Sequence, residues 1–119
     1  MPAFKLYSPR VLPEKFRYPA MLERFAQTGE HPFLYPWWFV DAESEAGALF
    51  FDIRQNDGRN LIPFAKVDDG RGDLACFDGD DGSGNPRVLM LVLDGSDRFY
   101  NFMDFDDWLF AAKKDANGG

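Results

Sequence analysis

The feature that most constrains this chain is the segment from residue 61 to residue 91, in which three β-prone apolar runs alternate with loops rich in Asp and Gly. The runs are LIPFAKV at 61–67, GDLACFD at 72–78 and RVLMLVLD at 87–94. Short apolar runs bounded by turn-forming residues are typical of strands, and the second run pairs naturally with the third through the loop at 79–86. Pro63 argues for a sheet edge or a bulge in the first strand, because proline has no N–H to donate.

Two more strands are expected before this segment. WWFVD at 37–41 is apolar and β-prone. In ALFFDIR at 48–54, Leu49, Phe51 and Ile53 point one way and the residues between them point the other, a period of two that is typical of a strand. With QNDGRN at 55–60 as an Asp-Gly turn, the sequence predicts an antiparallel sheet of about five strands.

Helical signals lie towards the two ends of the chain. The segment at 12–31 predicts two short helices, because Pro13 and Pro19 each suit a first turn and Gly29 suits a helix end. Near the C-terminus Asp104 is a good N-cap, and the residues after it form an apolar stripe. The stripe consists of Phe105, Trp108, Leu109 and Ala112. These signals predict a single α+β domain over residues 1–116, with N-terminal and C-terminal helices packed on the sheet and a disordered tail at 117–119.

The chain is long enough to form one hydrophobic core, and that core should be rich in aromatic side chains. It has 119 residues, among them thirteen Phe and three Trp, and a domain of that size buries roughly two thirds of its unfolded surface. Cys76 is the single cysteine, which excludes an internal disulfide and a metal site built on a cysteine pair. The sequence contains neither a signal-peptide pattern nor a run that approaches a membrane span, so we expect a cytoplasmic protein with no membrane contact.

The net charge of −7 is unevenly distributed along the sequence. Residues 1–40 carry five bases and three acids, whereas residues 41–119 carry eight bases and seventeen acids. Contacts with phosphate need a basic face, so this distribution argues against DNA or RNA as a direct ligand. It is compatible with a basic protein partner, and also with an acidic surface that only maintains solubility.

No residue set for catalysis or for a metal stands out. A loop starting at Asp78 has Gly82 and Leu89 where an EF-hand requires its fifth and twelfth ligands. A Ser–His–acid site needs a base, and the only histidine is His31, beside a proline in a loop. Cys76 lies in an apolar run with acids nearby, which raise a thiol pKa, so it is expected in the core. We therefore expect no enzyme activity, no catalytic residue, no metal ligand and no cofactor.

Acids in two loops are the candidate contacts for a basic partner. They are Asp41, Glu43 and Glu45 after the first strand, and Asp78, Asp80 and Asp81 in the hairpin loop. Tyr35 and Trp38 are the candidate aromatic anchors. Because Trp37 and Trp38 are adjacent in a strand, they face opposite ways; either one is core and the other half exposed, or both are core. Reversing the three hairpin-loop charges together is expected to slow association and to leave folding intact.

The order and spacing of several motifs resemble a known family. The motifs are IPFA at 62–65, Gly70, Gly72 and Asp73 in the following turn, Phe77 and Asp78 at the next strand end, Pro86, Val88 and Asp94, the pair Phe102 and Phe105 with Leu109, and LPEKF at 12–16. Together they resemble the signature of the SUKH superfamily, which includes bacterial immunity proteins and fungal cell-wall-synthesis regulators. The chain departs from this pattern in lacking the long leading helix.

The resemblance implies a single SUKH-like domain that acts by binding another protein. It implies an immunity protein that neutralises a cognate bacterial toxin, for which a nuclease with a basic surface fits the acidic composition. The alternative is a free-standing regulatory or scaffold protein of the same family that docks onto a cellular complex. For the oligomeric state, both a monomer and a weak homodimer paired through an edge strand stay open.

Overall fold

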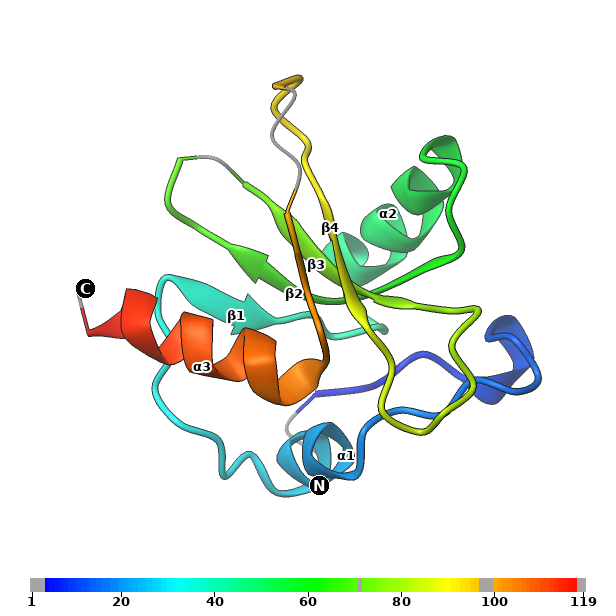
Figure 1. Cartoon of the computed structure of the whole chain (residues 1–119), viewed down its shortest axis with the longest axis horizontal. Helices are drawn as coiled ribbons and strands as arrows, with labels where there is room; N and C mark the ends of the chain where they lie inside the picture. Colours follow the sequence, from blue (N-terminus) through cyan, green and yellow to red (C-terminus); the bar gives the residue numbers. More distant parts are fainter. Residues whose placement is uncertain (1–3, 71, 97–99, 118–119) are drawn as a thin grey trace.

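Five strands form one antiparallel sheet whose spatial order follows the chain order (Figure 1). The computed structural model describes residues 4–70, 72–96 and 100–117. The strands are β1 (Trp37–Phe39), β2 (Leu61–Val67), β3 (Leu74–Asp78), β4 (Val88–Leu91) and β5 (Asn101–Phe102). The predicted α+β class with about five antiparallel strands is confirmed.

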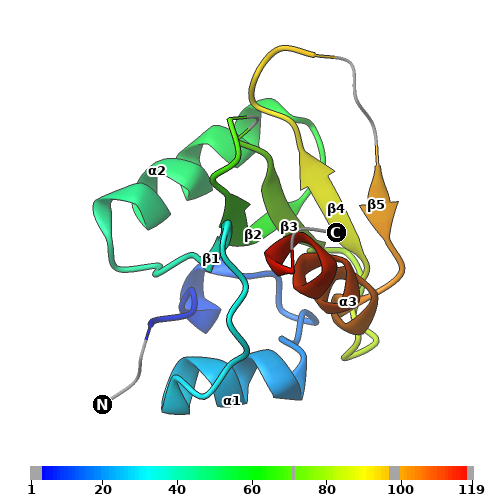
Figure 2. The same ribbon diagram turned by 90° about the vertical axis from the view of Figure 1, so that its left-hand side faces the viewer.

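Helices cover the sheet from both sides. Figure 2 shows α2 on one side of the sheet and α3 on the other, with α1 beside the end of the sheet. The helices are α1 (Ala20–Thr28), α2 (Glu45–Ile53) and α3 (Phe105–Ala116), with short 3₁₀ segments η1 (Pro9–Val11) and η2 (Arg54–Asn56). Because both faces are covered, β3 is buried at all five of its positions.

The C-terminal helix begins as predicted and closes the aromatic core. The Asp104 side chain accepts a hydrogen bond from the N–H of Asp107 at 2.9 Å, so Asp104 is the N-cap of α3. The predicted stripe of α3 is buried, and the Trp108 ring packs edge-on against Phe64 with centroids 4.9 Å apart. Phe64 in turn stacks on Phe77 at 4.2 Å. These contacts join α3 to the centre of the sheet.

The strand predicted at 48–54 is wrong, because these residues belong to α2 and to the start of η2. The Ser44 hydroxyl accepts the N–H of Gly47 at 2.9 Å and caps the helix. Gly47 and Phe50 are buried on the inner face of α2, whereas Leu49 is 56% exposed. A run of adjacent apolar residues fits the two-residue period of a strand and the 3.6-residue period of a helix equally well, and the N-cap at Ser44 favours the helix. The fifth strand is instead β5, which is too short for a periodic signal.

The N-terminal region contains one α-helix where two were predicted. Residues 12–16 form no α-helix, and Pro19 is the N-cap of α1 rather than part of its first turn. Gly29 ends α1 as predicted, with a φ of 72°. Pro63 lies at the predicted bulge, since the register between β2 and β3 shifts between Pro63 and Ala65.

Two further expectations concern the chain's last residues and membranes. Residues 118–119 of the predicted tail lie outside the described residues, and Asn117 is the C-cap of α3. Within the described part of the chain, every helix is too short or too polar to span a bilayer.

Candidate partner-binding face

The loop before β1 and the strand itself present three aromatic side chains to solvent. Phe33 is 78% exposed, Tyr35 is 62% exposed and Trp38 is 36% exposed. We call these three residues the aromatic face. Large apolar side chains left in water at one place on a domain mark sites of interaction with other molecules. Tyr35 and Trp38 were predicted as anchors, and their exposure is compatible with that role.

The two adjacent tryptophans separate as a strand requires. Trp37 is buried, its ring packs edge-on against Trp108 at 5.4 Å, and its Nε1–H donates to an Asp115 carboxylate oxygen at 2.9 Å. Trp38 points to the opposite side, where its ring lies 6.1 Å from that of Phe50 in α2. The open choice between one and two core tryptophans is thus resolved in favour of one.

Phe33 belongs to the aromatic face but was missed by the sequence analysis. Its ring stacks on that of Tyr35 with centroids 6.4 Å apart and an interplanar angle of 26°. A signal was available in HPFLYP at 31–36, where prolines flank three apolar residues. A proline-bounded loop of this length cannot bury every apolar side chain, and only Leu34 of the three is buried.

The acids after β1 differ in their surroundings. One Asp41 carboxylate oxygen accepts the backbone N–H groups of Lys5 at 3.2 Å and Glu43 at 3.0 Å. Asp41 therefore orders the turn into α2 as well as carrying a charge. Glu43 and Glu45 are exposed, and Glu45 lies in the first turn of α2, where the helix dipole favours an acid.

The acids of the hairpin loop mostly stabilise the loop itself. Asp78 is 5% exposed, pairs with the guanidinium of Arg87, and accepts the N–H of Asp80 at 3.0 Å. Asp81 accepts the backbone N–H groups of Ser83 and Arg87, each at 3.1 Å. A hydrogen bond from the Ser83 side chain is the main cause that lowers the pKa of Asp81, and the two backbone bonds lower it further. Of the three, Asp80 is the exposed one.

The two groups of acids do not form one patch. Trp38 lies opposite Lys66 near the end of β2, whereas Asp78 lies opposite Leu61 at its start. Five residues of strand separate these positions, which corresponds to roughly 15 Å. The structure brings Tyr35, Trp38 and Asp41 around one hollow and leaves the hairpin loop elsewhere.

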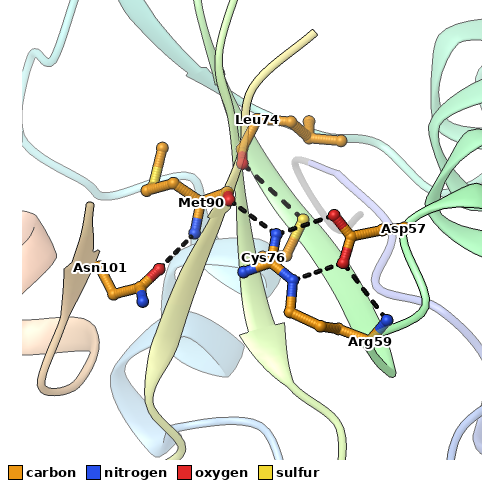
Figure 3. A network of polar contacts seen from close by, with 6 residues as sticks. All are labelled: Asp57, Arg59, Leu74, Cys76, Met90 and Asn101. Atoms are coloured by element: carbon orange, nitrogen blue, oxygen red, sulfur yellow. Dashed lines mark hydrogen bonds and ion pairs between the residues drawn. The ribbon is translucent and has the colours of Figure 1, made fainter. Parts of the chain in front are cut away.

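The polar contacts beside Cys76 connect a partly buried ion pair to the sheet. Figure 3 shows Arg59 between the carboxylate of Asp57 and the carbonyl of Met90, which it reaches at 3.0 Å. Cys76 is fully buried beside this pair, as predicted for a core residue, and burial raises the pKa of its thiol well above the usual range. A neutral, buried thiol is a poor nucleophile. Among the described residues, no three His, Cys, Asp or Glu side chains are grouped so as to hold a metal ion.

The turn after β2 contains glycines and a buried acid whose roles are structural. Gly70 and Gly72 have φ angles of 92° and 73°, which side chains rarely adopt. Asp73 is fully buried and accepts a hydrogen bond from the hydroxyl of Tyr100. These features stabilise the conformation of the turn.

Comparisons with protein-family models, with curated proteins and with solved structures return no match.

Proposed function

We propose that this protein is a cytoplasmic, non-catalytic binding domain that neutralises one cognate bacterial protein toxin, and that it binds the toxin through the aromatic face. The observation that carries the proposal is the exposure of these three rings beside acids in a stretch without a positive side chain. Residues 25–53 contain five acids and no Lys or Arg. The centres of protein interfaces are enriched in Tyr, Trp and Phe, and such anchors account for most of the binding free energy.

The charge of the protein supports a basic partner. A toxin that cuts nucleic acid needs a basic surface to hold phosphate, and an acidic protein that covers that surface blocks the substrate without any chemistry. Opposite charges also steer the two proteins together and raise the association rate by roughly 10- to 1,000-fold. The resemblance to SUKH immunity proteins adds support from the sequence.

A survival experiment tests this function. The last ~150 residues of the protein encoded immediately upstream, a length set by typical domain size, are expressed inducibly in a laboratory bacterium, alone and together with this protein. We expect death with the upstream domain alone and survival on co-expression. Absence of toxicity, or toxicity without rescue, contradicts the proposal and favours a module that docks onto a cellular complex, to be sought by pull-down from native cells.

A further inference from the structure

The aromatic face borders a hollow of about 430 Å³ beside β1. Phe4, Phe33, Tyr35 and Trp38 are among the residues that line it, and Asp41 also lines it. Among the described residues that line this hollow, Asp41 supplies the one carboxylate and there is no Lys or Arg. The volume is within the range of pockets that accept a small ligand or a single large side chain.

The Asp41 carboxylate has one oxygen available to a ligand. Its Oδ1 accepts the two backbone N–H groups that order the turn. Among the described residues, none donates a hydrogen bond to its Oδ2, and no Lys or Arg forms an ion pair with the Asp41 carboxylate. A group bound in the hollow can donate to Oδ2 without disturbing the turn.

Two other exposed or partly exposed aromatic rings, those of Phe51 and Phe110, are each covered by a cation of the chain itself. The Arg54 guanidinium lies 3.7 Å from the centroid of Phe51, and the Lys114 ammonium lies 4.7 Å from that of Phe110. In the described part of the chain, no Lys or Arg covers a ring of the aromatic face in this way. The described residues that line the hollow thus combine aromatic side chains with one carboxylate and include no Lys or Arg, a composition that suits a cation–π contact with a bound cation.

We propose that the hollow receives an arginine side chain of the partner, an inference that rests on the proposed function. Arginine is preferred over lysine because its flat guanidinium stacks on aromatic rings, is weakly hydrated, and still donates to a carboxylate at its edge. Charge complementarity supports the assignment, since residues 25–53, which supply the aromatic face and Asp41, contain five acids and no Lys or Arg, and the whole chain has a net charge of −7.

An NMR titration of the full chain with Nα-acetyl-arginine amide tests this site directly. We expect saturable shifts of the Trp38 indole and of the Tyr35 and Asp41 backbone amides. The lysine analogue carries the same charge and should bind more weakly, and the citrulline analogue, which has the shape of arginine without its charge, should not bind. Equal shifts with citrulline, or arginine shifts confined to other residues, would overturn the inference.

Two variants that each remove an aromatic ring of similar exposure show whether the arginine binds in the hollow. Tyr35→Ala should weaken arginine binding about fivefold, the change that corresponds to one cation–π contact of about 1 kcal/mol. Phe110→Ala removes a ring that is 61% exposed, against 62% for Tyr35, and does not line the hollow, so its affinity should equal that of the parent. Equal weakening by both variants would also overturn the inference.

The titration and the survival experiment test separate claims, so a negative result in one does not decide the other. Rescue from toxicity without arginine binding in the hollow overturns this inference and leaves the proposed function standing. Arginine binding without any rescue contradicts the proposed function alone.

Discussion

At the scale of single residues, acids that look alike in the sequence have different tasks in the structure. Asp78, Asp80 and Asp81 occupy one short loop, yet Asp78 is buried in an ion pair and Asp81 accepts two backbone N–H groups. Burial and hydrogen-bond partners depend on how the loop folds back on β3, which local composition does not encode. Reversing all three charges is therefore expected to damage the loop, contrary to the expectation from sequence.

The matched pair Asp78→Asn and Asp80→Asn separates these tasks. Both variants remove one negative charge from the same loop, but Asp78→Asn also breaks the ion pair between the buried Asp78 carboxylate and Arg87. We expect Asp78→Asn to lower the free energy of unfolding by about 1–2 kcal/mol, a moderate loss because the Arg87 side chain is 64% exposed. Asp80→Asn should stay within about 0.5 kcal/mol. Urea unfolding measures both, and similar losses in the two variants would contradict the assignment.

The pair of Asp57 and Arg59 makes the stability depend on pH. The hydrogen bond from Arg59 is the main cause that holds the pKa of Asp57 below its usual range. A lowered folded-state pKa stabilises the protein above the ordinary range of Asp, near 4, and this contribution is lost as pH falls through the folded-state value.

We therefore expect Asp57→Asn to lower the free energy of unfolding by about 1 kcal/mol at pH 7, and expect the difference from the parent to shrink at acidic pH. Urea midpoints measured from neutral pH down to the acid limit of folding give this difference directly. A difference that stays constant or grows on acidification would show that the ion pair is not its source.

At the scale of elements, the sequence predicts best where local and tertiary preferences agree. The three strands at the centre of the sheet and helix α3 were predicted because their apolar periods, Gly-containing turns and Asp104 cap all indicate the same structure. The prediction fails at residues 48–54, where adjacent apolar residues fit a strand and a helix equally well. It also misses β5, whose two residues pair with β4 for tertiary reasons alone.

For the candidate site, the sequence indicated the residue types but not their grouping. Tyr35, Trp38 and Asp41 meet around one hollow because β1 and the flanking turns bring them together, and Phe33 joins them from the loop. Which of two adjacent tryptophans points outward depends on the side of β1 that α3 covers, and this is a property of the packed fold.

Gly47 tests the placement of α2. A Cβ atom on Gly47 would lie 2.0 Å from the carbonyl oxygen of Asp41, which is backbone and cannot move away cheaply. Although alanine favours helices over glycine by about 1 kcal/mol, we expect Gly47→Ala to lower the free energy of unfolding by about 2–3 kcal/mol.

Ala48→Gly is the control for this variant, because Ala48 is exposed in the same helix and loses only helix propensity, about 1 kcal/mol. Thermal or urea unfolding compares the two. A Gly47→Ala variant that is as stable as the parent, or more stable, would contradict the close approach of α2 to the turn at Asp41.

At the scale of the whole molecule, the aromatic face joins the fold to the proposed function. The core uses most of the chain's rings, including the packed set of Phe64, Phe77 and Trp108. Phe33, Tyr35 and Trp38 stay at the surface near the edge strand β1, next to the acidic turn that leads into α2. An acidic molecule that keeps aromatic side chains exposed in a stretch without Lys or Arg is suited to a basic protein partner.

The most direct test of this account is the affinity of the purified toxin domain for two double variants, measured by calorimetry. Phe33→Ala with Tyr35→Ala removes two of the three rings of the aromatic face. Met103→Ala with Phe110→Ala removes side chains of the same exposure, 77% and 61% against 78% and 62%, at the β5–α3 side. We predict that the first variant weakens binding by about 30-fold or more, as loss of an anchor of about 2 kcal/mol requires, and that the second binds like the parent. Unchanged binding by the first variant, or an equal loss in the second, would contradict the aromatic face as the contact surface.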